Sequence, residues 1–242
     1  EDRFQGKLSP DFWKFTTING GGKVSNEMDW HSTAIVVNNA LTLQHFPDPL
    51  FANESPAWRT PGPEQYNNVT LIGGSGFCPS KSRDVVLKFT MWSDKRFYGT
   101  AGVIFQQAGT LNQDGFFVKP FDMFGFYVAG KESSIMGING PFCCLALKQA
   151  PVQVEPLPVD IQSLHAYEIR LRWIERTKWL GIIKVDDTVQ CQIAMPAFGP
   201  VEVHVWSDNA LVQHRPRRWW EVGPAMDLKC QDGGEKQFNL GM

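Results

Sequence analysis

The sequence predicts an all-β protein built as an antiparallel β-sandwich. About a dozen short segments alternate between apolar and polar residues, which is the pattern of half-buried strands. Helical periodicity is almost absent, and glycine, proline, asparagine and aspartate separate the segments. Many short strands joined by such turns are typical of sandwiches and barrels. No internal repeat is visible, which argues against a propeller.

Each predicted strand follows from its own alternation. The first two cover residues 12–18 and 40–46, and a loop rich in proline, glycine and asparagine follows over residues 47–68. The later predicted strands carry the sequences DVVLKFTMWSD, TAGVIFQQ, FGFYVAG, CCLALKQ, YEIRLRWIE, LGIIKVDD, VQCQIAM, VEVHVWSD and RWWEV. Turns are expected at Gly109, residues 112–115, Gly130, residues 139–141, Asp186-Asp187 and residues 198–200. Residues 150–160 contain three prolines, which cannot donate to a ladder, so this segment is predicted to lie at an edge or crossover.

Composition and charge narrow the classes of protein. The chain has 242 residues, of which 43% are hydrophobic and 20% charged, as expected of one globular unit. We expect a single sandwich domain over residues 1–242. The net charge of -2 is spread along the chain without basic or acidic blocks, so neither nucleic acid nor an anionic membrane is an expected partner. No apolar run approaches the roughly 20 residues that span a bilayer.

Two features favour the secretory pathway. Asn53 and Asn68 each begin an Asn-x-Ser/Thr triplet in a loop-like region, so both are predicted glycosylation sites. The five cysteines are compatible with two disulfides and one free thiol, and buried free thiols are the alternative. The first residues lack a signal-peptide core, so we expect that any signal has been removed.

Strand parity predicts a binding face. In VEVHVWSDN, residues 201–209, the valines share one face, while Glu202, His204 and Trp206 share the other. The same parity groups Lys88, Thr90 and Trp92 on one strand, and Glu168, Arg170 and Arg172 on another. These residues would converge if the strands share a sheet, and Gln106 and Tyr127 would join them from neighbouring strands. A solvated sheet face is the alternative, but tryptophan is costly to leave in water.

Most of the chain resembles one fold family. The opening FQGKLSPDFWKFTTINGGGKVSNEMDWHSTAIVVNNALTL and the later HAYEIRLRWIER, KVDDTVQC and GPVEVHVWSDN resemble concanavalin A-like lectin and glucanase domains. This resemblance implies a jelly-roll sandwich with a concave ligand face. It is a pattern of strands and turns, so it is specific for fold rather than for function.

The acids that this fold family uses for glycoside hydrolysis are not recognisable. Retaining glycosidases need two carboxylates ~5–5.5 Å apart, and in this family they occupy alternate residues of a central strand in a pattern close to Glu-x-Asp-x-x-Glu. The nearest match, Glu27-x-Asp29, lacks the third acid and precedes the early strand, while Glu168 and Glu202 are isolated. Nucleophile elbows, phosphate-binding loops, dinucleotide fingerprints and paired metal-binding histidines are also missing, so no metal or other cofactor is expected.

Three functions stay open: a carbohydrate-binding module, a glycosidase with unusual residues, and a cofactor-free cyclase. The length, strand pattern and missing acid pair also resemble the secreted fungal hetero-Diels–Alderases, which join an ortho-quinone methide to a terpene alkene. The cyclase is the preferred hypothesis, with a small hydrophobic molecule as partner in place of a carbohydrate. The expected hydrogen-bond donors are Arg170, Arg172, His204 and Lys88. The expected substrate contacts are Trp92, Trp206, Tyr127, Phe89, Gln106 and Thr90, although Phe89 fits the core equally well.

Overall fold

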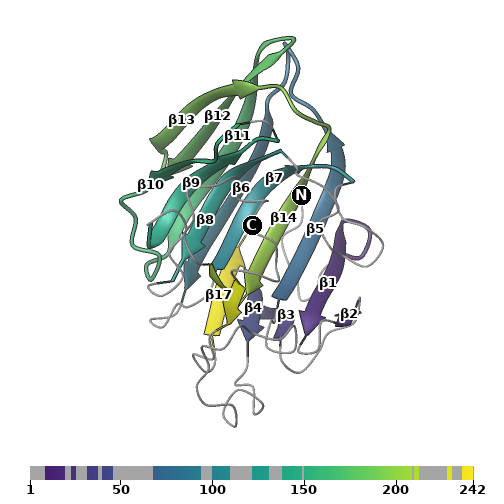
Figure 1. Cartoon of the computed structure of the whole chain (residues 1–242), viewed down its shortest axis with the longest axis vertical. Helices are drawn as coiled ribbons and strands as arrows, with labels where there is room; N and C mark the ends of the chain where they lie inside the picture. Colours follow the sequence, from purple (N-terminus) through teal and green to yellow (C-terminus); the bar gives the residue numbers. More distant parts are fainter. Residues whose placement is uncertain are drawn as a thin grey trace.

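The structure is a computed structural model, and it consists of two facing antiparallel sheets (Figure 1). It describes residues 9–19, 23–25, 32–37, 40–45, 68–93, 100–109, 122–130, 138–148, 150–208, 210–212, 228–230 and 236–241. The predicted all-β sandwich is confirmed. Within these residues, no helix has the length and apolar character needed to cross a membrane.

The first sheet, which we name sheet A, contains eight of the described strands. Their order across the sheet is β10 (Gln153–Pro156), β9 (Gly140–Ala146), β8 (Met123–Ala129), β7 (Thr100–Gln107), β14 (Val201–Asp208), β5 (Asn68–Phe77), β1 (Trp13–Asn19) and β2 (Lys23–Ser25). The segment that contains β10 was predicted to be an edge or crossover strand, and β10 does lie at the edge.

The second sheet, named sheet B, contains seven described strands. Their order is β13 (Thr188–Pro196), β12 (Lys178–Val185), β11 (His165–Glu175), β6 (Val85–Ser93), β17 (Lys236–Gly241), β4 (Ala40–His45) and β3 (Ser32–Val37). A small separate ladder joins β15 (Ala210–Val212) to β16 (Leu228–Cys230).

The main core lies between the two sheets. Sheet A contributes the inward valines of β14, and sheet B contributes the alternate residues of β11 and β6. Val205, Ile169 and Met91 are completely buried there. Val203 and Val205 therefore fill the core, while the residues between them must face the opposite side of sheet A.

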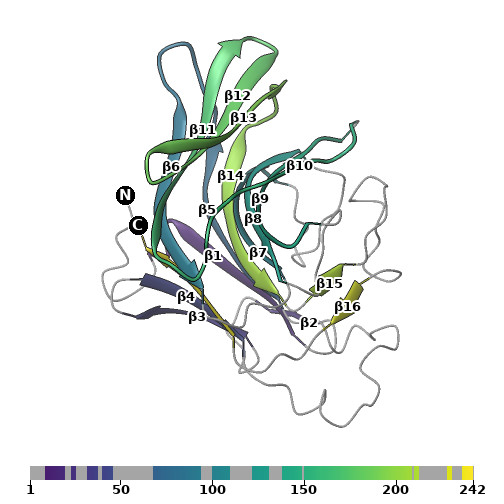
Figure 2. The ribbon, with the colours of Figure 1, turned by 90° about the vertical axis from the view of Figure 1, so that its left-hand side faces the viewer.

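The strands β14, β7, β8 and β9 of sheet A are largely buried on both faces, whereas β6 and β11 of sheet B are not. Every described residue of β7 except its last is buried, and the buried residues of β8, β9 and β14 form a second apolar cluster on the side away from sheet B. Figure 2 shows the strands of sheet A bending so that this second side is concave. In β6 and β11, by contrast, most residues that face away from the core are exposed or half-buried, and Glu168 is a buried exception.

The sequence analysis missed several strands, of which β5 matters most. β5 is an internal strand of sheet A and lies between β14 and β1. Its glycines made the segment look like a loop, and Gly74 and Gly76 adopt positive φ values of 50° and 83°. They lie at an irregularity where the pairing with β14 jumps from Val201↔Phe77 to Val203↔Gly73. β2, β3, β15, β16 and β17 were also missed, whereas the predicted strand RWWEV lies outside the described residues.

The predicted turn at Asp186-Asp187 is confirmed as the two-residue connection between β12 and β13. Both aspartates have positive φ, 47° and 63°, as a type I′ hairpin turn requires. The Asp186 carboxylate also accepts hydrogen bonds from the Ala166 amide at 2.9 Å and from His165 Nδ1 at 2.6 Å. This turn is therefore tied to the start of β11.

Candidate functional site

The concave face of sheet A is the candidate site, and β14 runs through its centre. Glu202, His204 and Trp206 alternate with core valines, so all three side chains face the concave side. In the pairing of β14 with β7, Glu202 lies opposite Gln106, and His204 lies opposite Ile104. The prediction that this strand turns a histidine and a tryptophan away from the core is confirmed.

Glu202 and His204 form a buried polar pair. His204 Nε2 lies 2.8 Å from Glu202 Oε1, and the two residues are only 2% and 8% exposed. The donor and acceptor roles in this contact depend on the tautomer of His204.

Trp206 is held on three sides by its neighbours. Its ring lies over Gly102 on β7, where an added Cβ would overlap the indole. Its Nε1 donates a hydrogen bond to Thr100 Oγ1 at 3.3 Å, and its ring meets that of Tyr127 edge-on with centroids 4.4 Å apart. Tyr127 in turn stacks on Phe142 at 5.2 Å. The result is a fixed aromatic wall across β14, β8 and β9.

The rest of this face is mainly apolar. The second cluster comprises Ile104, Met123, Ala129, Phe142, Cys144, Ala146, Val152 and Trp206. Gln106, predicted as a substrate contact, is completely buried beside Glu202. The concave positions of β7 are Thr100, Gly102, Ile104 and Gln106, and none of them is acidic. Over β7, β8, β9 and β14 the face therefore combines a carboxylate–imidazole pair and an amide with aromatic and aliphatic surfaces, while the exposed Lys14 of β1 shares this face through the register of Ile72 with His204.

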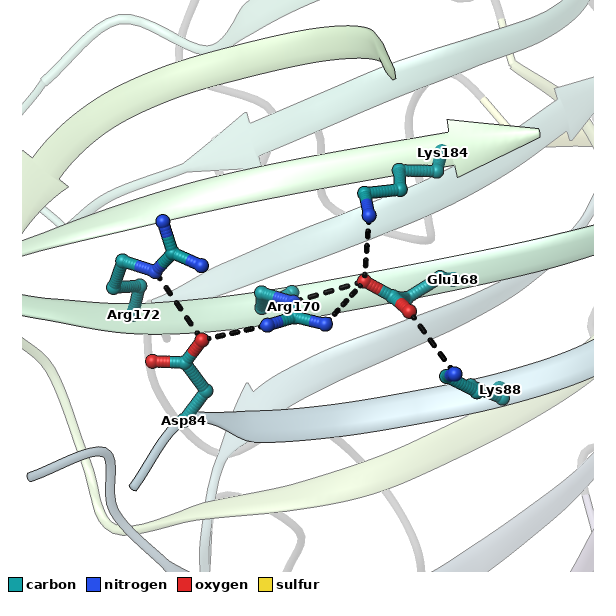
Figure 3. Close-up of polar contacts among 6 residues, drawn as sticks. All are labelled: Asp84, Lys88, Glu168, Arg170, Arg172 and Lys184. Atoms are coloured by element: carbon teal, nitrogen blue, oxygen red, sulfur yellow. Dashed lines mark hydrogen bonds and ion pairs between the residues drawn. The ribbon is translucent and has the colours of Figure 1, made fainter. Parts of the chain in front are cut away.

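The predicted convergence of all candidate residues on one face is wrong. β6 and β11 belong to sheet B, so Lys88, Arg170 and Arg172 lie on a different sheet from His204, Trp206, Gln106 and Tyr127. Their side chains take part in a charged cluster on the outer face of sheet B (Figure 3). Strand parity gave the correct face of each strand, but it does not say which strands share a sheet.

Glu168 and Arg170 form the centre of this charged cluster. Arg170 donates to Glu168 at 2.8 Å and to Asp84 at 2.8 Å, and Arg172 lies 3.2 Å from the same aspartate. Lys88 and Lys184 approach Glu168 at 3.5 and 3.6 Å. Burial alone would raise the pKa of Glu168, but the Arg170 hydrogen bond and the three cations outweigh it and lower that pKa. Every cation in the cluster therefore has a carboxylate partner.

The remaining predicted contacts on β6 also lie away from the candidate site. Phe89 is a core residue, 3% exposed and stacked on Tyr167 at 5.3 Å, so its predicted role as a ligand wall is wrong. Thr90 and Trp92 are half-buried and alternate with buried residues of this strand of sheet B. Their distance from β14 follows from the sheet order.

The predicted modification sites have different outcomes. Asn53 lies outside the described residues, and Asn68 begins β5 without a described side chain, so both stay predictions. Cys78, Cys143, Cys144 and Cys191 are free thiols in this structure. Within the described part of the chain, no group of three or more histidine, cysteine, aspartate or glutamate side chains is arranged to hold a metal.

Several residues of the candidate site were missed by the sequence analysis. Thr100, Gly102 and Ile104 lie on β7, while Met123, Phe142 and Cys144 lie on β8 and β9. The available signal was the nearly continuous apolar character of TAGVIFQQ, FGFYVAG and CCLALKQ, which indicates burial on both faces of a strand.

Comparison with known proteins identifies the fold. No family model matches the sequence, and no curated protein does. Similar solved structures include an endo-acting O-glycanase of the human gut microbiota, with a TM-score of 0.59, 13% identity, and coverage of 99% of this chain and 96% of that one. A glycosyl hydrolase family protein from Mycobacterium fortuitum has a TM-score of 0.53, 10% identity, and coverage of 99% and 96%. LamAcat from Zobellia galactanivorans has a TM-score of 0.52, 13% identity, and coverage of 99% and 93%. The chain therefore has the concanavalin A-like jelly-roll fold of glycosyl hydrolases.

Proposed function

We propose that the concave face of sheet A binds a small, mainly apolar ring-containing molecule and that the protein is a cofactor-free cyclase acting on it. The observation that carries this proposal is the buried Glu202–His204 pair within an aromatic and aliphatic face. A hydrophobic substrate would contact Trp206, Tyr127 and the aliphatic side chains of β7 and β8. The polar pair would then be the centre that orients and polarises it.

The reaction that suits this face is a hetero-Diels–Alder cycloaddition. An ortho-quinone methide would supply its carbonyl oxygen and its exocyclic carbon, and a terpene alkene would supply two carbons. Three π bonds of the two reactants become two new σ bonds and one new π bond. No atom, electron pair or proton therefore leaves the reactants. The protein has only to hold the partners in a reactive orientation and to stabilise charge on the oxygen, which together can lower the barrier by several kcal/mol.

The structure changes which residues we assign to these roles. Arg170, Arg172 and Lys88 lie on sheet B, and we no longer propose them as donors to the substrate. Gln106, whose side-chain amide carries N–H donors, takes that role beside Glu202, which holds the neighbouring His204 in place on the same face. Trp206 and Tyr127 keep the role of aromatic walls.

A carbohydrate ligand is the second candidate, and the fold comparison favours it. The structure with a TM-score of 0.59 is an O-glycanase that initiates mucin breakdown, and a β-1,3-1,4-glucanase from a mouse hindgut metagenome has a TM-score of 0.50. Two-carboxylate hydrolysis fits the face poorly. The concave positions of β7 beside Glu202 carry no second acid, whereas retaining enzymes need two carboxylates ~5–5.5 Å apart. This candidate is therefore a lectin-like binding function.

Thermal stabilisation by two ligand panels separates the candidates. We expect terpenoid and tropolone compounds to raise the melting temperature, and the rise to disappear in His204→Ala when it is measured against that variant's own baseline. Gln192→Ala, at an exposed position of β13, is the control and should keep the full rise. A rise with oligosaccharides alone would replace the cyclase with the carbohydrate-binding function. A rise that His204→Ala leaves intact would remove the concave face from the proposal.

A further inference from the structure

Two cysteines from different sheets meet in the main core. Cys143 lies on β9 of sheet A, and Cys191 lies on β13 of sheet B. Both belong to the cluster between the sheets, where they are 0% and 2% exposed. Their side chains hydrogen-bond to each other. The two thiols are therefore in contact across the interior of the sandwich, although the residues are far apart in sequence.

The other described cysteines are placed differently. Cys144 follows Cys143 directly, so its side chain faces the opposite side of β9 and packs in the concave cluster. Cys78 is exposed, beyond the end of β5. Vicinal pairing of Cys143 with Cys144 is thus opposed by strand geometry. Among the four cysteines whose side chains are described, contact across the sheets singles out Cys143 and Cys191.

We propose that Cys143 and Cys191 form an inter-sheet disulfide when the chain folds in an oxidising compartment. The two thiols lose two protons and two electrons as the S–S bond forms. The electron acceptor is the disulfide of a thiol oxidoreductase or of oxidised glutathione, which is reduced to two thiols. The bond would join β9 to the edge strand β13 and enclose β10, β11 and β12 in one covalent loop.

The burial of the pair determines when the bond can form. The hydrogen bond to Cys191, burial, and the electrostatic effects of Cys191, Cys144 and Glu155 all raise the pKa of the Cys143 thiol. The thiolate is the species that attacks a disulfide, and an enclosed core also keeps an oxidant away. Oxidation should therefore occur while the sandwich assembles. Once folded in the reduced form, the protein should resist oxidation.

The inference is independent of the proposed cyclase. Cys143 faces the space between the sheets, whereas the candidate site lies on the other face of sheet A. Loss of the disulfide should lower stability without removing the residues of the concave face. Failure of one proposal therefore does not imply failure of the other.

Disulfide mapping of the wild-type protein tests this inference directly. The protein is refolded in a glutathione redox buffer, remaining thiols are alkylated under denaturing conditions, and peptides are analysed without reduction. We expect a peptide linked through Cys143 and Cys191. Native protein prepared in the reduced form and then exposed to the same oxidant should form this link at least ten-fold more slowly. Linkage of either cysteine to another partner, or alkylation of both, would overturn the inference.

Stability measurements give a second, independent readout. Reduction should lower the melting temperature of the oxidised wild type by roughly 5–15 °C, as expected for loss of one disulfide in a chain of this size. Cys191→Ala should melt at the same temperature with and without reductant, whereas Cys78→Ala should keep the wild-type response. An equal response to reductant in Cys191→Ala and wild type would contradict the pairing.

Discussion

Glu202 and His204 are adjacent concave-facing residues of β14, and their side chains are joined by a 2.8 Å contact in a buried setting. A polar pair in an apolar surround is costly unless its members satisfy each other. The pair is also the one described place on this face where a carboxylate orients an imidazole. This relationship gives the most direct test of the site.

Glu202→Gln should lower turnover while leaving the fold intact. The amide keeps the size of the side chain but weakens the charge-assisted contact that orients His204. We expect the rate of cycloaddition to fall by about 10²–10³-fold, the size of effect seen when one preorganised donor is lost. Steady-state kinetics with a circular dichroism spectrum measures both properties. Arg172→Ala, in the cluster of sheet B, should keep wild-type turnover. A loss of activity in Arg172→Ala equal to that in Glu202→Gln would reject the assignment.

Gly102→Ala should displace the Trp206 ring. A Cβ at this position overlaps the indole, and overpacking of this kind typically costs about 1–3 kcal/mol. In this variant both the free energy of unfolding and the affinity for the ligand should fall, because the Trp206 ring is displaced. Adding Trp206→Leu should remove the overlap, so the double variant should be more stable than the sum of the two single changes predicts.

Gly125→Ala provides the matched control for this double-mutant cycle. A Cβ at Gly125 would meet the backbone of Ile104 rather than the Trp206 ring. Trp206→Leu should therefore bring it no relief. Chemical denaturation measures the free energies of unfolding of the wild type, the three single variants and the two double variants. Additive effects of Gly102→Ala and Trp206→Leu would contradict the packing described above.

The free energy of unfolding should fall in acid partly because of Glu168. The pKa of Glu168 is lowered in the folded protein, where burial is outweighed by Arg170 and the neighbouring lysines. Its stabilisation is thus fully present above the unfolded pKa of about 4.3 and is lost as the pH falls through the folded value. Glu168→Gln should lower the free energy of unfolding by about 1–3 kcal/mol at pH 7. The free energy of unfolding of this variant should also change less between neutral and acid pH.

Part of the acid dependence should survive in Glu168→Gln. The Ala166 amide and His165 lower the pKa of Asp186, and hydrogen bonds from Gln162 and Ser163 lower that of Asp160. Denaturation curves between pH 7 and pH 3 compare the two proteins. Equal slopes in wild type and Glu168→Gln would show that the cluster on sheet B does not contribute.

Replacing either aspartate of the β12–β13 turn by glycine should change stability, but in opposite directions. Both have positive φ, which favours glycine, so Asp187→Gly should raise stability by about 0.5–1 kcal/mol. Asp186→Gly would gain the same backbone relief but lose the hydrogen bonds to Ala166 and His165, and it should be net destabilising. Thermal denaturation of both variants checks the ordering. The reverse order would contradict the role given to Asp186.

The sequence predicted local structure better than it predicted how the strands assemble. Alternation located β6, β11 and β14 and gave the correct faces of Val203 and His204, because side-chain direction is fixed within a strand. It could not show that Arg170 and His204 lie on different sheets. That separation depends on strand order, which arises from pairings between distant segments. β5 was missed because its glycines serve an irregular pairing that exists only beside β14.

The two-residue period of β14 divides the strand into two sets of positions with different tasks. The valines hold the sheets together, while Glu202, His204 and Trp206 are presented to whatever lies on the concave face. Directed evolution restricted to the second set, with its partners Gln106 and Tyr127, would explore new ligand preferences while leaving the inter-sheet contacts unchanged. Because of this division, the ligand-binding residues could be replaced without redesigning the residues that pack the two sheets together.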